Sequence, residues 1–171
     1  MLKRLPDPPA AFDDKTGSMT FDLRQHLSGS IKSEGVIFGP TGRLVSRFVA
    51  DMEGEWDGNR GQLREAFRFA SGATEQRCWS ITLRDDGRYT ATAGDIIGQA
   101  GGVIEGTSVK SLYRLKLGAD AGNHIVSVED WMYLSESGVI LNRSKFRKFG
   151  IKVGELFATL RPVSGTPSSD L

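Results

Sequence analysis

Apolar and polar residues alternate with a period of two along most of this chain, and turns that contain glycine interrupt the alternation at short intervals. This period is the pattern of β-strands that bury one face. The predicted strands cover residues 31–38, 44–55, 62–69, 75–83, 88–93, 97–105, 110–117, 124–134, 139–148 and 152–161. Because no helix separates them, they form successive hairpins, and closing the sheet removes its exposed edges. The pattern predicts an all-β fold, an antiparallel meander β-barrel of about eight to ten strands.

A short N-terminal helix is predicted before the first strand, over residues 22–27. Asp22 is a favourable N-cap, Leu23 and Leu27 fall on one face, and Gly29 is placed to end the helix. Such a helix can plug one end of the barrel.

The two ends of the chain differ in composition from its centre. Residues 1–20 and 163–171 are rich in Pro, Gly, Ser and Asp and show no period, so we predict flexible arms around a barrel domain at 21–162. The first residues are basic but no apolar run follows them, and no stretch approaches the length of a membrane-spanning helix. The expected location is therefore cytoplasmic.

Alternation also assigns the side chains that point into the barrel. In the strand at 62–69, Leu63, Phe67 and Phe69 share one face with Glu65. Since the apolar face packs inward, this carboxylate is expected in the lumen.

Further strands carry a polar residue on an inward face. Arg77 shares its face with Trp79, and Asn142 stands among apolar residues of the ninth strand. Both faces of the eighth strand are partly apolar, so Asp130 is inward if the valine face is inward. Both faces of the last strand are partly apolar, which leaves the direction of Glu155 open.

An unpaired charge inside a protein is costly, so these groups need partners. Arg77 is the expected partner of Glu65, and its guanidinium fork can serve two carboxylates. Three interpretations remain open. The charges form a structural ion pair that fixes strand register, Arg77 binds the acidic or carbonyl head of a ligand, or a desolvated carboxylate transfers a proton.

A ligand in the lumen would lie against polar and aromatic side chains of several strands. The predicted ligand-binding residues are Glu65, Phe67, Arg77, Trp79, Tyr113, Asp130 and Asn142.

Other motifs give weaker signals. The glycine-rich run at 98–106 lacks the spacing of a nucleotide-binding loop, and we interpret its glycines as bulges and bends in a curved strand. Trp56 closes a Gly-x-Trp triplet of the kind that lipocalins carry, here as a core or rim aromatic. The basic cluster at 143–148 is a solvated outer face or a contact with anionic lipid headgroups.

Composition narrows the chemistry. Lys and Arg total 22 against 21 Asp and Glu, a balance that gives no overall field for nucleic acid. The two histidines are far apart, and the single cysteine, Cys78, points away from the predicted interior. No disulfide, metal site or cofactor is therefore expected.

Several segments together resemble a bacterial family known as domain of unknown function 3833. They lie at 35–42, 48–58, 63–69, 77–79, 93–100, 129–134 and 142–150, and DWMYL and AGDIIG are the most specific blocks. The resemblance covers about residues 21–161 and implies a lipocalin-like (calycin) barrel. Its recurrent polar positions correspond to Glu65, Arg77, Asp95, Asp130, Asn142 and Arg143.

The resemblance also bears on function. Members are often encoded near lipid-modifying enzymes, which implies fatty-acyl ligands. Many carry a lipoprotein signal and an anchoring cysteine, which this chain does not show, so envelope anchoring is not expected. The leading hypothesis is a protein that binds a small apolar, fatty-acyl-like ligand inside the barrel. The alternatives are a cofactor-independent isomerase, cyclase or hydratase that uses Glu65 or Asp130, and an accessory protein that docks on a lipid enzyme through its basic face.

Overall fold

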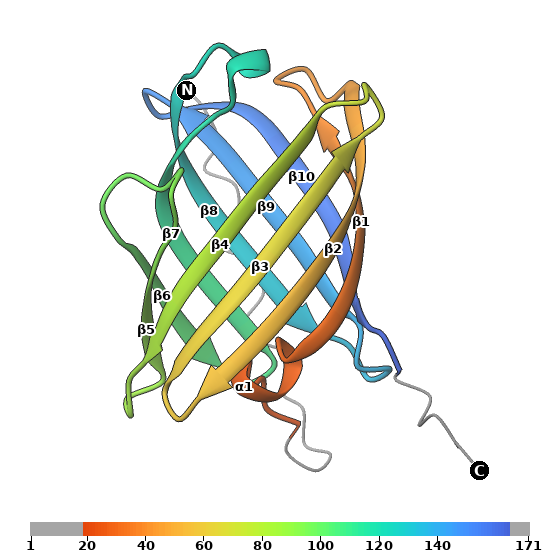
Figure 1. Cartoon of the computed structure of the whole chain (residues 1–171). Helices are drawn as coiled ribbons and strands as arrows, with labels where there is room; N and C mark the ends of the chain where they lie inside the picture. Colours follow the sequence, from red (N-terminus) through yellow and green to blue (C-terminus); the bar gives the residue numbers. More distant parts are fainter. Residues whose placement is uncertain (1–18, 165–171) are drawn as a thin grey trace, which may run out of the picture.

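The computed structural model describes residues 19–164, and within them ten strands form one closed barrel (Figure 1). The strands are β1 (Gly29–Phe38), β2 (Leu44–Asp57), β3 (Arg60–Phe69), β4 (Thr74–Leu83), β5 (Arg88–Thr92), β6 (Ala100–Glu105), β7 (Ser108–Lys116), β8 (Ile125–Leu134), β9 (Ile140–Lys148) and β10 (Ile151–Pro162). Helix α1 (Leu23–His26) precedes them, and a 3-10 turn, η1 (Ala119–Ala121), lies between β7 and β8. The predicted meander barrel and its short helix are confirmed.

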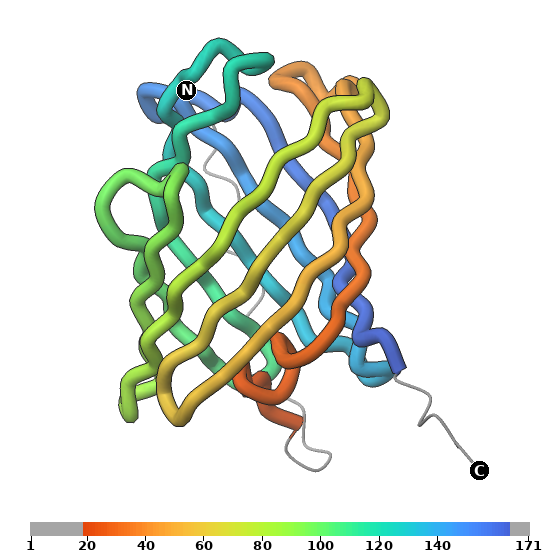
Figure 2. The backbone as a smooth tube through the Cα atoms, viewed as in Figure 1, coloured from red at the N-terminus to blue at the C-terminus, as the bar shows by residue number. Residues whose placement is uncertain are grey.

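Each strand pairs antiparallel with its neighbours in sequence, and β1 closes the barrel by pairing with β10. The strands run at a steep tilt around the barrel, as the backbone tube shows (Figure 2). Lipocalin barrels have eight strands, so this barrel has more. The predicted arms at 1–20 and 163–171 fall almost entirely outside the described residues.

Helix α1 closes one end of the barrel (Figure 1). Asp22 caps it through a 2.9 Å hydrogen bond from the Arg24 backbone N–H, and Leu27 is 3% exposed. The indole Nε1 of Trp56 donates to the Leu27 carbonyl at 3.0 Å. A Cβ at Gly54 would lie 1.9 Å from that same oxygen, so β2 can approach the end of the helix this closely only with glycine there.

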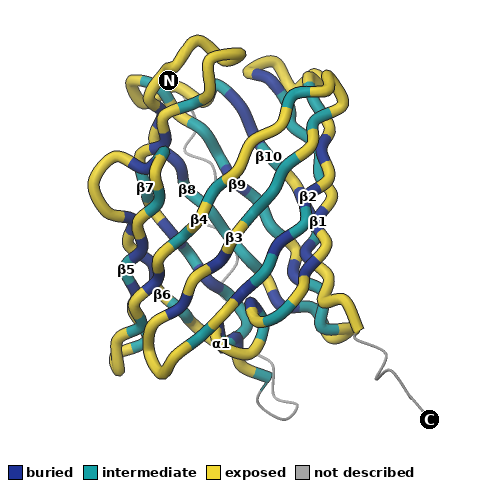
Figure 3. Tube along the Cα trace, viewed as in Figure 1, coloured by how far each residue is buried: buried dark blue, intermediate teal, exposed yellow. Residues whose placement is uncertain are grey.

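Burial alternates along the strands as the two-residue period requires (Figure 3). The inward assignments of β3, β4, β8 and β9 are confirmed, since their residues line the interior. The ambiguous last strand turns Leu156, Ala158 and Leu160 inward. Glu155 therefore lies on the outside, where its carboxylate accepts from Arg143 at 2.6 Å and from Lys152 at 3.0 Å.

The predicted strand at 97–105 is wrong at its start, because β6 begins only at Ala100. The preceding loop is instead attached to β7: the Ile97 N–H donates to Arg114 O at 2.9 Å, and the Lys116 N–H donates to Asp95 O at 2.8 Å. These hydrogen bonds fix the position of Asp95.

The glycines at 98–106 do not form bulges, because β6 keeps an unbroken register with β5 and β7 in the described sheet. Gly102 instead makes room for a neighbour, since a Cβ there would lie 2.1 Å from the Tyr89 ring. Within residues 19–164, no helix has the length and apolar character needed to cross a membrane.

Candidate functional site

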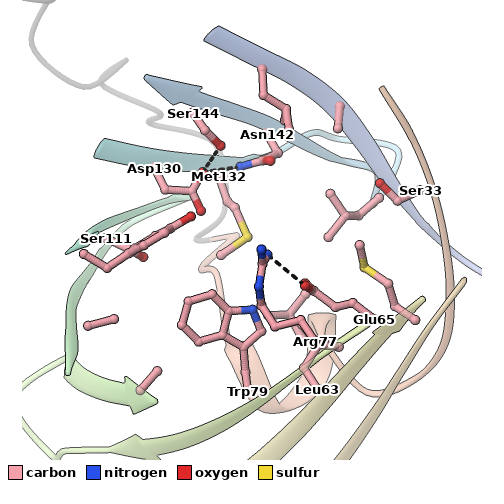
Figure 4. A pocket seen from close by; sticks show the side chains of 18 of the residues that line it. Ser33, Leu63, Glu65, Arg77, Trp79, Ser111, Asp130, Met132, Asn142 and Ser144 are labelled. Atoms are coloured by element: carbon pink, nitrogen blue, oxygen red, sulfur yellow. Dashed lines mark hydrogen bonds and ion pairs between the residues drawn. The ribbon is translucent and has the colours of Figure 1, made fainter. Parts of the chain in front are cut away.

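A cavity of about 140 Å³ lies inside the barrel. Leu23 and Leu27 of the α1 segment line one end of it, and Leu115 and Phe146 belong to the apolar side chains further along the lumen. Every predicted ligand-binding residue lies on its wall: Glu65, Phe67, Arg77, Trp79, Tyr113, Asp130 and Asn142. Figure 4 shows the polar members of this set turned toward the same space. Alternation thus placed these side chains correctly in the lumen.

Arg77 holds two carboxylates (Figure 4 shows the first). Its Nη1 donates to Glu65 Oε2 at 3.3 Å, and these two residues are directly paired across β3 and β4. Its Nε lies 2.9 Å from Asp95 Oδ2, and its Nη2 lies 2.8 Å from the same oxygen. The expected Arg77–Glu65 pair is confirmed, and the second carboxylate comes from the loop before β6.

Two aromatic rings lie close to the guanidinium. The Arg77 Cζ lies 5.7 Å from the centroid of the Phe67 ring and 5.7 Å from that of Trp79. Trp79 in turn meets Tyr113 edge to face at 5.4 Å. Cation–π contacts of this kind add to the ion pairs when the cation is desolvated, so Arg77 is fixed in orientation as well as in charge.

Asp130 lies apart from this cluster, and no side chain among residues 19–164 forms a salt bridge with it. Its Oδ1 accepts from Asn142 Nδ2 at 2.7 Å and from Ser144 Oγ at 2.6 Å (Figure 4). Its Oδ2 has no hydrogen-bond partner among residues 19–164. β9 supplies both donors because Ser144 pairs directly with Asp130, and Met132 with Asn142, in the β8–β9 register.

Burial changes the protonation of the luminal acids. Desolvation raises the pKa of Glu65 to about 7, although Arg77 opposes the shift. Desolvation also raises the pKa of Asp130, against the hydrogen bonds from Ser144 and Asn142. Burial alone would lower the pKa of Arg77, but Glu65 and Asp95 outweigh it and raise that pKa, so Arg77 stays charged.

Three further hydroxyl groups, those of Ser33, Tyr89 and Ser111, lie on the cavity wall. Ser33 Oγ is buried and has no hydrogen-bond partner in the described part of the chain. Tyr89 and Ser111 share a hydrogen bond with each other. Because an unpartnered buried hydroxyl is costly, Ser33 offers a hydrogen bond to whatever occupies the cavity.

The ligand-binding residues predicted from the sequence did not include five polar residues of the site: Ser33, Tyr89, Asp95, Ser111 and Ser144. The family resemblance had marked Asp95, and strand alternation had turned Ser144 inward. Nothing in the residue pattern singled out Ser33, since an inward serine carries no periodic signal of its own.

The raised acid pKa values give a testable pH dependence. Folded Glu65 keeps its proton up to about pH 7, whereas in the unfolded chain the carboxyl has its ordinary pKa of 4.5. The free energy of unfolding should therefore fall as the pH rises through this window, by about 3 kcal/mol for this group. Glu65→Gln should flatten that slope, as measured by urea unfolding at about pH 5 and about pH 8.

The pH dependence of the free energy of unfolding that remains in Glu65→Gln serves as an internal check. The pKa of Asp130 is also raised, so any slope that the variant keeps should have the same sign, and Asp130→Asn should not make it steeper. Glu155 has a lowered pKa and loses its contribution only at more acidic pH, so it does not mask the effect. Equal slopes in wild type and Glu65→Gln would contradict the assignment.

The site shows no metal-binding arrangement: within residues 19–164, no group of three or more His, Cys, Asp or Glu side chains is placed to hold a metal ion. One comparison supports the family named by the sequence resemblance. No curated protein matches the chain. The family described as "Protein of unknown function (DUF3833)" matches residues 9–162, which include the whole barrel and every residue of the luminal site. The chain therefore belongs to the DUF3833 family.

Proposed function

We propose that the barrel binds a small ligand with an apolar body and a head that donates hydrogen bonds. The observation that carries this proposal is the unused hydrogen-bonding capacity of the barrel cavity, at Ser33 Oγ and at Asp130 Oδ2. A purely structural network would satisfy these groups within the protein. A ligand donor would satisfy them instead.

The charges on the cavity wall favour one kind of polar head on the ligand. Arg77 is the only cation on the cavity wall within the described residues, and Glu65 and Asp95 already neutralise it. Asp130 adds a further acid. An acidic head, expected from sequence, would face more negative than positive charge. An amine or hydroxyl head could donate to Asp130 and, if cationic, would favour its ionised form.

The cavity volume selects the size of the body. About 140 Å³ is close to the roughly 150 Å³ of an apolar cavity that accepts one benzene molecule. It is well below the roughly 300 Å³ of the smaller pockets that take drug-sized ligands. A long fatty-acyl chain would require the lumen to widen, so we favour a short ligand with one ring or a few carbons.

Four probes that share one ring and differ in the head test this proposal: benzylamine, benzyl alcohol, toluene and benzoate. Benzylamine and benzyl alcohol should raise the midpoint of thermal unfolding, because ligands that bind only the folded state stabilise it. Toluene should do so less, and benzoate should have no effect. Calorimetric titration then gives each affinity.

Asp130→Asn is the matched variant, since it keeps the shape of the side chain and an acceptor oxygen for Asn142 and Ser144, but it removes the charge and replaces the unpartnered oxygen with an NH2 donor. It should weaken benzylamine about tenfold and leave toluene unchanged. Binding of benzoate as tight as that of benzylamine would overturn the proposed head. Binding of laurate in place of all four probes would support the fatty-acyl hypothesis instead.

A further inference from the structure

The turn between β9 and β10 presents an apolar tip to solvent. Phe149 is 94% exposed and Ile151 is 70% exposed. Lys148 and Ile151 are directly paired, so the turn has two residues, Phe149 and Gly150. Their φ angles of 50° and 77° are those of a type I′ hairpin.

Phenylalanine is a poor choice for this position. Type I′ turns favour Asn-Gly, and a bulky residue at positive φ is an outlier that costs free energy. The exposed ring of Phe149 recovers almost none of that cost by burial. Its only aromatic or cation–π neighbour among the described residues is Lys148, whose Nζ lies 5.8 Å from the ring centroid. The fold therefore does not explain this side chain, and a contact outside the molecule would.

The surroundings of the tip are basic. Arg147 and Lys148 immediately precede the turn, and neither has a carboxylate within ion-pair distance among residues 19–164. Lys152 follows it and shares Glu155 with Arg143. The outer face of β7 adds exposed Arg114 and Lys116, and Lys145 adds another cation on β9. This is a strong local concentration for a chain whose net charge is +1.

The neighbouring strand extends the apolar part of this region. Ser127 of β8 pairs with Arg147, so Ile125, two residues earlier, occupies the register position beside Phe149. Ile125 is 41% exposed. We define the basic-apolar tip as Ile125, Arg147, Lys148, Phe149, Ile151 and Lys152.

We infer that the basic-apolar tip docks the protein on the surface of an anionic lipid bilayer. Phe149 and Ile151 would enter the boundary between headgroups and acyl chains, while the long basic side chains extend to the lipid phosphates. An anionic bilayer suits this tip for two reasons. The single exposed aromatic side chain lies at the end of a narrow hairpin with several basic residues nearby, and the negative surface potential of the bilayer attracts several cations at once.

Vesicle cosedimentation tests the inference. The full chain should bind phosphatidylglycerol-containing vesicles, should bind pure phosphatidylcholine vesicles at least about tenfold more weakly, and should lose affinity as salt is added. Phe149→Asn should reduce binding to the anionic vesicles by about tenfold or more. The same substitution suits a type I′ turn, so it should raise the thermal unfolding midpoint, and loss of binding then cannot come from loss of fold.

Two further variants complete the experiment. Arg147→Glu/Lys148→Glu should also weaken anionic binding at least about tenfold. Leu112→Thr removes a 54% exposed apolar side chain from the barrel wall and should leave vesicle binding unchanged. The inference is overturned if the protein binds neither vesicle, if it binds both equally, or if Phe149→Asn binds as wild type does.

Discussion

Replacing Arg77 with Met is expected to destabilise the barrel by about 3–5 kcal/mol, the range for removing one partner of a buried ion pair. The guanidinium side chain is 15% exposed and compensates Glu65, which is 9% exposed, and Asp95. Methionine keeps most of the apolar volume between Phe67 and Trp79, so lost packing contributes little. The cost arises because the two carboxylates are left without a cation.

The pH dependence of this cost is diagnostic and can be measured by urea unfolding. At about pH 5 Glu65 is protonated in the folded state, so Arg77→Met should be less damaging there than at about pH 8. Arg77→Lys is the matched control: it keeps the charge but loses the fork, and its cost should be intermediate. A cost below about 1 kcal/mol for Arg77→Met at both pH values would contradict the assigned role.

Phe21→Ala is expected to cost about 3–5 kcal/mol, as truncation of a buried phenylalanine does. Phe21 is 1% exposed, its ring lies edge-on against His26 at 5.2 Å, and its N–H donates to Gly106 O at 2.8 Å. It therefore ties helix α1 to the hairpin between β6 and β7. Truncation should loosen the helix that closes the lumen.

Urea unfolding measures this cost, and amide hydrogen exchange locates it. The Leu27 N–H donates to Leu23 O at 2.9 Å. Its exchange rate should rise from wild type to the variant by more than the rates of amides in the central strands do. Phe149→Ala is the matched control, because the same atoms are removed from a side chain that is 94% exposed; its effect should stay within about 0.5 kcal/mol. Equal costs at the two positions would contradict the closing role of Phe21.

Alternation predicted much of the site because a two-residue period fixes which face each side chain takes. Once the apolar face of β3 is inward, Glu65 must be inward too, and the same reasoning places Arg77, Asp130 and Asn142. The ion-pair partners of these residues could be predicted only where the two strands are adjacent in the sheet. Glu65 and Arg77 are cross-strand neighbours, so their pairing could be predicted.

The remaining contacts depend on structure that has no period. Asp95 reaches Arg77 from a loop, and that loop is positioned by backbone hydrogen bonds to β7 that any sequence could make. β10 was ambiguous for a different reason: its outer face is also apolar, since Phe157 packs on Phe38 at 6.1 Å and beneath Arg143 at 5.4 Å. Where both faces carry apolar side chains, alternation carries no directional information.

The seam between β1 and β10 has a kinetic consequence. It joins Ile31 to Pro162, so the contact that completes the sheet is also among the most distant along the chain. Loop-closure entropy opposes such contacts until most other strands are in place, and barrels of this kind fold in milliseconds to seconds rather than microseconds. Before the seam forms, β1 and β10 are both unpaired edges, so nascent chains are most vulnerable to intermolecular strand pairing at that stage.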